Sequence, residues 1–318
     1  MHRETYENID GEQRLMAALH SSEYRKCHQA MVMKRNHYSK EEKARIARVL
    51  QENRNYVLIG DEDYPGKLYD MQWPPLVLFY EGQLELLKRP SIGMVGARNC
   101  SAYGRRITAD LAGALAKTGF VIISGGAAGI DAAAHKTTLE ESGKTVCVLG
   151  CALDISYPRE NEKLFSVIKK EGLVLTEYPK GFGPKKWTFP MRNRIIAALS
   201  DEIIVAEATE KSGSLHTASY GEELNRTIHA IPHEVYSASG AGTNLLIEMG
   251  AHIIIRKENL LYDLLMRNPE VLLLRIRDLN LLDLKPTMED LEKIFCLNKV
   301  KGLYWKEKLE TDLNHCFR

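Results

Sequence analysis

The stretch FVIISGGAAGIDAAAH, residues 120–135, carries the pattern that decides the fold of this chain. An apolar run of strand length enters a glycine-rich turn, and the turn opens a stretch of helical composition. Such a turn presents backbone N–H groups and the positive end of the helix dipole, which suits an anion. It matches neither G-x-G-x-x-G nor G-x-x-x-x-G-K-S/T, so the sequence does not predict a dinucleotide or nucleoside triphosphate site. A tight strand-to-helix turn without a ligand is the alternative.

The same alternation of strand and helix extends over about residues 91–256. Strands are expected at 92–97, 120–124, 145–149, 173–176, 202–206, 227–231 and 252–255. Helical stretches lie between most of them, at 102–117, 130–142, 161–171 and 215–224. Strands rich in Val and Ile that alternate with helices favour a parallel sheet covered on both faces. We therefore predict an α/β fold with a doubly wound, mostly parallel sheet, whose binding crevice lies outside the carboxyl ends of the strands.

Two shorter regions flank this sheet domain. We predict a helical N-terminal region at 1–56, the sheet domain at 57–256 and a helical C-terminal region at 257–318. In the first region, Ser39 and Glu42 form a capping-box pattern ahead of helical apolar spacing. A further strand is possible at 76–80, and the last region is rich in Leu.

The composition is that of an ordinary soluble globular protein. The 318 residues are 44% hydrophobic, and 43 Lys and Arg against 42 Asp and Glu give a formal net charge of +1. This balance argues against a strongly basic nucleic-acid protein, so a polyanion would need a local basic patch. The sequence contains no apolar run of about 18 residues, so we predict no membrane-spanning helix. The six scattered cysteines form no Cys-x-x-Cys pair, so we expect no metal site and a cytoplasmic location.

The sharpest local feature lies between the fourth and fifth expected strands, at residues 179–194. It contains no acid, five cations and three aromatics: Lys180, Lys185, Lys186, Arg192 and Arg194, with Phe182, Trp187 and Phe189. Cations that follow a backbone, with aromatics on which bases stack, are typical of a groove for single-stranded nucleic acid. A solvated loop whose aromatics fold onto the core is the alternative. We expect a helix to begin at Arg192.

Other strand-end loops carry residues suited to phosphate. Arg98 follows the first strand and offers a fork of donors, and Ser212 with Gly213 precedes a helix. Glu207 is unusual in an anion pocket, and we expect it to orient a cation such as Arg98 or Arg194.

The ordered set of these motifs resembles the DNA-processing protein A family (DprA/Smf). The matching pieces are V-G-A-R at 95–98, S-G-G-A-A-G-I-D at 124–131, Y-P at 157–158, F-P-M-R-N-R-I-I at 189–196, S-G-S-L-H-T-A at 212–218 and G-T-N-L-L-I-x-x-G-A at 242–251. They cover roughly residues 56–256. Two segments upstream of these motifs, at 64–65 and 75–82, also resemble the corresponding segments of the family.

The resemblance implies an extended Rossmann-like domain that binds single-stranded DNA without sequence preference. It implies protection of incoming strands in natural transformation, help in loading a RecA-type recombinase, homodimers, no cofactor and no catalysis. Motif match carries over Arg98, Ser124, Gly125, Lys186, Phe189 and Arg194. The basic segment and the helix start add the remaining expected DNA contacts, which are Lys185, Arg192, Ser212 and Gly213.

The chain departs from the family pattern at three positions. Ala128 stands where the family usually has arginine, His233 follows Pro232 in place of glycine, and Ala152 replaces a common glycine. Two alternatives stay open, the first from a more distant similarity to the nucleotide-binding superfamily and the second from Ala128. One is a nucleotide-binding sensor or phosphoribohydrolase-like enzyme that uses Asp131, His135 and Glu207, although the G-G-x-G-T-x-x-E pattern of such hydrolases is missing. The other is a scaffold whose pocket has lost its ligand.

Overall fold

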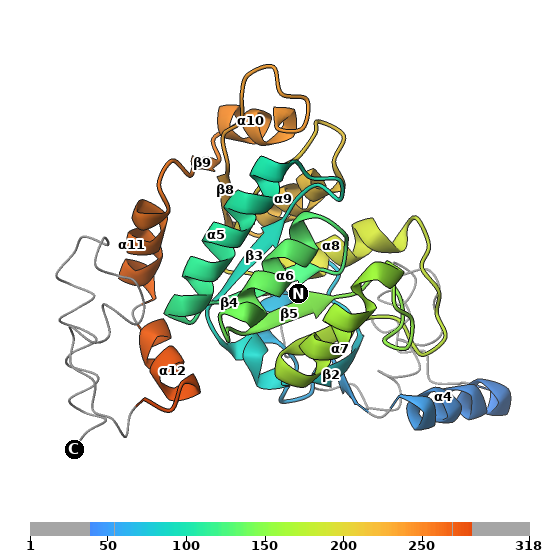
Figure 1. Cartoon of the computed structure of the whole chain (residues 1–318). Helices are drawn as coiled ribbons and strands as arrows, with labels where there is room; N and C mark the ends of the chain where they lie inside the picture. Colours follow the sequence, from blue (N-terminus) through green and yellow to red (C-terminus); the bar gives the residue numbers. More distant parts are fainter. Residues whose placement is uncertain (1–38, 54, 269, 282–318) are drawn as a thin grey trace.

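A nine-stranded mixed sheet runs through the part of the chain that the structure describes (Figure 1). This structure is a computed structural model, and it describes residues 39–281 except 54 and 269. The strand order is β1-β2-β6-β5-β4-β3-β7-β8-β9. Their bounds are β1 (Tyr56–Leu58), β2 (Val77–Gly82), β3 (Ser91–Val95), β4 (Val121–Gly125), β5 (Thr145–Val148), β6 (Leu173–Thr176), β7 (Glu202–Val205), β8 (Thr227–Ala230) and β9 (His252–Ile253).

Across the sheet, all neighbours in the series β6-β5-β4-β3-β7-β8-β9 pair in parallel. At the other edge, β2 pairs antiparallel with both β6 and β1. Every strand expected from the sequence is present, including the possible one at 76–80. The α/β fold with a mostly parallel sheet is confirmed.

Helices cover both faces of the sheet (Figure 1). Their bounds are α5 (Ala102–Thr118), α6 (Ile130–Glu140), α7 (Glu162–Glu171), α8 (Thr188–Leu199), α9 (Gly213–Glu223) and α10 (Ala241–Glu248). Because successive strand residues point to opposite faces, neighbouring side chains of β4 enter different cores. Ile122 packs in one cluster with Leu111 of α5, and Ile123 packs in the other with Ile196 of α8. This double winding is the arrangement that the sequence predicted.

The strand order changes direction at β3, which has β4 on one side and β7 on the other. The chain crosses from β3 to β4 through α5 on one face and from β6 to β7 through α8 on the other. Loops that leave the carboxyl ends of β3 and β7 therefore separate and leave a crevice between them, which is where open α/β sheets bind ligands.

Helix α8 begins at Thr188, four residues before the start expected at Arg192. Pro190 falls in its first turn, where a missing N–H costs nothing because those groups have no intrahelical partner. The Thr188 hydroxyl donates to the Lys185 carbonyl oxygen at 2.8 Å, which steadies this start. The earlier start places Phe189 and Arg192 on the same helix, three residues apart.

The terminal regions are described in part. Helix α4 (Lys40–Glu52) begins directly after Ser39, and α11 (Lys257–Arg267) and α12 (Glu270–Asp278) follow β9. Leu264, Leu265 and Leu272 are fully buried in the cluster that contains Leu111 of α5, so the first helices beyond residue 256 pack directly onto the sheet domain. The division of the chain at 56 and 256 stays a prediction, and 1–38 and 282–318 lie outside the described residues. No described helix is both long enough and apolar enough to span a membrane.

Candidate functional site

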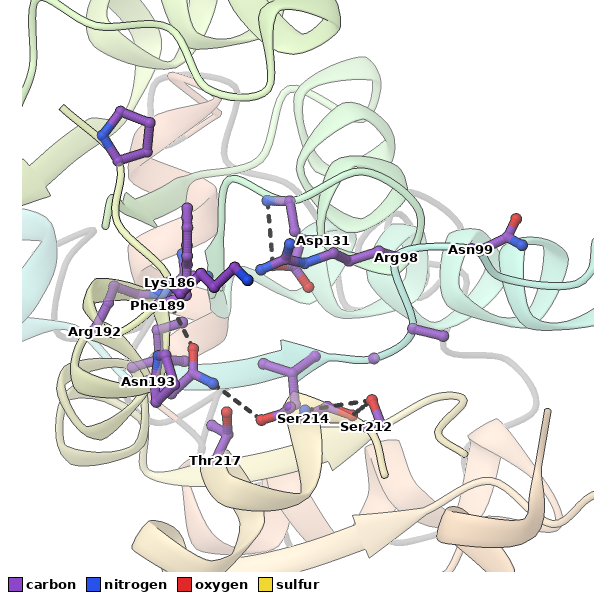
Figure 2. Close-up of a pocket in the computed structure, with 18 of the residues that line it drawn as sticks. Arg98, Asn99, Asp131, Lys186, Phe189, Arg192, Asn193, Ser212, Ser214 and Thr217 are labelled. Carbon is purple, nitrogen blue, oxygen red and sulfur yellow. Dashed lines mark hydrogen bonds between the residues drawn. The ribbon is translucent and has the colours of Figure 1, made fainter. Parts of the chain in front are cut away.

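A cavity of about 720 Å³ opens at the carboxyl ends of β3 and β7 (Figure 2). Three segments line most of it: 95–99 after β3, 184–196 around the start of α8, and 209–217 around the start of α9. A second cavity of about 260 Å³ adjoins it on the side of β5. The crevice predicted at the strand ends is therefore present.

Two exposed cations face each other across the main cavity. Figure 2 shows the side chains of Arg98 and Lys186 pointing toward one another. The Arg98 guanidinium carbon lies 4.9 Å from the centroid of the Phe189 ring, a cation–π contact that aims the guanidinium into the cavity. Within residues 39–281, neither cation forms an ion pair with a carboxylate. Two like charges converge here on a space that suits an anion.

A buried cation lies beneath them, at the floor of the cavity. Arg192 is 5% exposed, and its guanidinium donates to the carbonyl oxygen of Val148 and to Asn193 Oδ1, the latter at 3.1 Å. Burial lowers the pKa of Arg192, and the neighbouring Asp131 opposes this shift. Burial likewise raises the pKa of Asp131, while Arg192 and Arg98 favour its ionised form. Arg192, with Asp131 beside it, thus forms a fixed floor of the cavity.

The N-terminus of α9 forms the opposite wall. Ser212 is its N-cap, and its hydroxyl accepts from the backbone N–H of Ser214 at 3.4 Å. A side chain at Gly213 would meet nothing within 4 Å, so this helix end is open toward the cavity. Asn193 of α8 donates to the Gly213 carbonyl oxygen at 3.0 Å and fixes the distance between the two helices.

Seven of the ten expected site residues line this cavity together: Arg98, Lys185, Lys186, Phe189, Arg192, Ser212 and Gly213. The sequence analysis missed Asn193 and Tyr157, which also line it. Both stand inside motifs already noted, at 189–196 and 157–158. Tyr157 is 41% exposed, and its ring centroid lies 5.4 Å from that of Phe189.

The other three expected residues lie behind the cavity wall. Ser124 is fully buried, and its hydroxyl donates to the Met94 carbonyl oxygen at 2.5 Å, which ties β4 to β3. Gly125 borders Arg192, because a Cβ there would lie 2.1 Å from the guanidinium. Arg194 is 5% exposed; it pairs with Glu177 at 2.5 Å and donates to the Trp73 carbonyl oxygen at 2.8 Å. Helix residues two apart point about 200° apart, so Arg192 and Arg194 cannot both face the cavity.

The three aromatics of residues 179–194 do not all behave alike. One faces the cavity, as expected for a strand-binding groove, whereas two pack against neighbouring rings, as expected for a folded loop. Phe189 faces the cavity, as a stacking residue requires. Phe182 instead stacks on Tyr178, with 4.7 Å between centroids and 14° between ring planes, and Lys185 Nζ lies 4.9 Å from its centroid. Trp187 packs edge-on against both rings and stays 44% exposed.

The residues of the hydrolase alternative do not converge. His135 is fully buried, with Nδ1 2.6 Å from Thr145 Oγ1 and Nε2 2.8 Å from the Gly125 carbonyl oxygen, and burial lowers its pKa to about 4. Glu207 does not orient Arg98 or Arg194, so that expectation is wrong. Its buried carboxylate accepts from the backbone N–H and hydroxyl of Ser101 and thereby fixes the start of α5. Among residues 39–281 no cluster of His, Cys, Asp and Glu could hold a metal ion.

Comparison with known proteins finds a matching family and several relatives. The family model described as DNA recombination-mediator protein A matches residues 55–265. Protein Smf from Synechocystis is 43% identical over 218 residues, which cover 67% of this chain and 55% of that protein. DNA processing protein DprA from Bacillus subtilis is 38% identical over 224 residues, which cover 70% of this chain and 75% of that protein. The match therefore spans only about half the length of the Synechocystis relative.

Two solved structures are also similar. DNA processing protein A from Streptococcus pneumoniae superposes with a TM-score of 0.67 at 32% identity, over 81% of this chain and 95% of that one. DNA processing protein A from Helicobacter pylori, solved for its single-stranded DNA binding mode, gives a TM-score of 0.62 at 35% identity, over 67% of this chain and 97% of that one.

Proposed function

The chain belongs to the DNA recombination-mediator protein A family, as its motifs predicted, and on that premise we propose that it binds single-stranded DNA during DNA processing. The proposal includes protection of incoming strands in transformation and help in loading a RecA-type recombinase. It places the protein in the cytoplasm as a binding protein without catalysis. The observation that carries it is the pair of facing cations, Arg98 and Lys186, beside the Phe189 ring.

The facing cations account for the affinity for a strand. Two positive side chains directed at one space repel each other unless an anion lies between them. A backbone phosphate meets that need, and its binding would release counterions from the strand. The open N-terminus of α9 at Ser212 and Gly213 offers backbone N–H groups to a second phosphate.

The aromatic side chains account for the preference for single strands. Phe189 and Tyr157 line the cavity with ring surface, and stacking on such rings requires a base that is not held in a duplex. Because the overall charge is only +1, little non-specific attraction to duplex DNA adds to this local grip.

The buried residues of the motifs have a supporting role in this proposal. Ser124, Gly125 and Arg194 hold the wall and floor in place, while the seven lining residues contact the strand. Their direct and indirect contributions separate experimentally, since an exposed lining residue such as Lys186 changes affinity without changing stability.

A labelled oligothymidylate titrated by fluorescence anisotropy tests the function. We expect the double variant Lys186→Ala, Phe189→Ala to bind about tenfold more weakly or worse, with unchanged thermal unfolding. The control Lys163→Ala removes an exposed cation from α7, away from the cavity, and should bind like the parent. Equal affinity of the double variant and the parent would reject the assignment of this cavity.

We also propose that the protein forms a homodimer through the far edge of the sheet. β9 is the outermost strand, and an edge strand offers unpaired N–H and C=O groups to another chain. Exposed apolar side chains gather on the same segment of sequence: Val235, Tyr236, Leu245, Met249, Ile253 and Ile255. A second copy covers such a patch with the same patch in a two-fold arrangement, which buries apolar area on both copies.

A further inference from the structure

One aromatic of the basic segment, Trp187, lies beside the main cavity with much of its surface exposed. It is the N-cap residue of α8 and is not among the lining residues, although Lys186 and Phe189 on either side of it are. Its exposed fraction is 44%, and among the aromatic residues that the structure describes only Tyr236 is more exposed. A large ring in this position is open to a ligand that extends out of the cavity.

The neighbouring rings support one side of this indole and leave the other uncovered. Phe182 and Tyr178 stack with 4.7 Å between their centroids, which lie 6.2 and 6.0 Å from the Trp187 centroid. Both rings therefore lie in the same direction from Trp187, and together they cover at most one of its faces. A ring held against a rigid base, with surface still open to solvent, has the geometry of a stacking platform.

Lys185 connects this aromatic cluster of Tyr178, Phe182 and Trp187 to the cavity. It lines the cavity, and its Nζ lies over the Phe182 ring, 4.9 Å from the centroid. Lys186 lines the same wall, and both lysines are exposed. Within residues 39–281, neither of them forms an ion pair with a carboxylate. A phosphate backbone that leaves the cavity on this side therefore passes two cations that can neutralise it.

Acidic side chains lie on the far side of the aromatic cluster. A separate cavity of about 420 Å³ lies there, and its charged lining residues are Glu52, Glu81, Asp154 and Lys180. The Asp154 carboxylate accepts from the backbone N–H of Gly181 at 3.0 Å, so it lies next to the turn that carries Phe182. Because carboxylates repel phosphates, we expect a strand to end at the aromatic cluster rather than to continue toward α4.

We propose that Trp187 is a stacking platform outside the cavity, on which the bound strand lays a base beyond the nucleotides held between Arg98 and Lys186. This proposal rests on the proposed function and extends it, since the footprint on the strand then reaches past the cavity. Stacking there adds affinity without regard to sequence, because every base has a π-face. Strands short enough to occupy only the cavity gain nothing from Trp187, whereas longer strands do.

Thymidylates of two to twelve nucleotides, used as competitors in anisotropy titrations of the full chain, test the footprint. We expect Trp187→Ala to bind the shortest strands like the parent and the longest about tenfold more weakly, which is the loss expected for one stacked base. Trp187→Phe retains a ring, so its affinity should stay within about twofold of the parent at every length.

Tryptophan fluorescence gives a second readout. A base stacked on an indole quenches its emission, so the longest thymidylate should lower the emission of the parent protein. Trp187→Phe should lose this response while it still binds. Trp73→Phe serves as control: it removes an indole outside the cavity lining, keeps the backbone carbonyl to which Arg194 donates, and should retain the response.

Four outcomes would overturn the proposal. They are parent affinity of Trp187→Ala for the longest strand, a loss that is equal at every length, no quenching in the parent, and quenching that persists in Trp187→Phe. Parent affinity of Trp187→Ala together with altered sedimentation would assign the indole to a contact between copies instead. All of these leave strand binding by the parent intact, whereas failure of the parent to bind any thymidylate would reject the proposed function as well.

Discussion

The guanidinium of Arg192 occupies the space that a side chain at Gly125 would fill, since a Cβ there would lie 2.1 Å from Nη1. The glycine-rich turn after β4 and the arginine on α8 are therefore two halves of one contact. The sequence suggested a turn that presents backbone N–H groups to an anion. In the folded protein, the group that approaches Gly125 is the chain's own buried cation.

Gly125→Ala should consequently destabilise the protein by about 2–3 kcal/mol, because the methyl group displaces Arg192 from a buried, hydrogen-bonded position. Urea unfolding followed by circular dichroism measures the loss. Gly183→Ala is the matched control, since a Cβ at Gly183 meets nothing within 4 Å. Equal stabilities of the two variants would contradict the contact.

Arg98→Ala and Lys186→Ala should each reduce the salt dependence of strand binding. If each cation neutralises one phosphate, its removal lowers the slope of log affinity against log salt concentration by about 0.7 for a single strand. Anisotropy titrations at several salt concentrations give the slope. Phe189→Ala should weaken binding by about 1–3 kcal/mol at every salt concentration with the slope unchanged, because stacking involves no counterion. A changed slope in that variant would assign Phe189 a different role.

The homodimer prediction is tested at the β9 edge by Ile255→Glu, which places a charge at an apolar position that is 74% exposed. We expect sedimentation velocity to show a shift from dimer to monomer, since a second copy would have to desolvate the charge. Val167→Glu, at an exposed apolar position on α7, should leave the association unchanged. A monomeric parent protein, or a dimer that tolerates Ile255→Glu, would place the interface elsewhere or remove it.

Stability should fall in mild acid because of His135. Its pKa is lowered by burial from 6.5 to about 4, so the unfolded chain takes up a proton that the folded protein refuses. The contribution is complete above pH 6.5 and is lost as the pH falls toward 4, by roughly 2 kcal/mol between pH 6.5 and 5.

Urea unfolding at a series of pH values measures this loss. His135→Gln should flatten the dependence between pH 6.5 and 5, whereas His216→Gln, at an exposed position on α9, should keep it. A parent protein whose stability is constant over that interval would contradict the burial of a neutral His135.

Much of the architecture could be predicted from local pattern. Short runs of Val and Ile such as 121–123 and 203–205 favour strands buried on both faces, and the helical stretches between them favour parallel pairing. The crevice followed, because parallel strands bring their carboxyl ends to one edge. Seven of its lining residues came from the family resemblance, from the basic segment at 179–194 and from the helix start at Ser212. Composition could also identify residues 179–194 as a segment that combines cations and aromatics without an acid.

The sequence by itself therefore determined a mostly parallel sheet with helices on both faces and a ligand edge at the carboxyl ends of its strands, since these depend on periodicity and on the alternation of segments. The strand order, the strand β1 and the antiparallel pairing of β2 with β6 emerged only from the tertiary structure. Only the tertiary structure decided which side chains reach the cavity. The 200° between Arg192 and Arg194 on α8 sends one to the cavity floor and the other to Glu177. Pairing of β4 with β3 brings the Ser124 hydroxyl to the Met94 carbonyl oxygen, and the backbone N–H of Ser101 donates to the Glu207 carboxylate. Those directions depend on contacts between distant segments, which no local pattern contains.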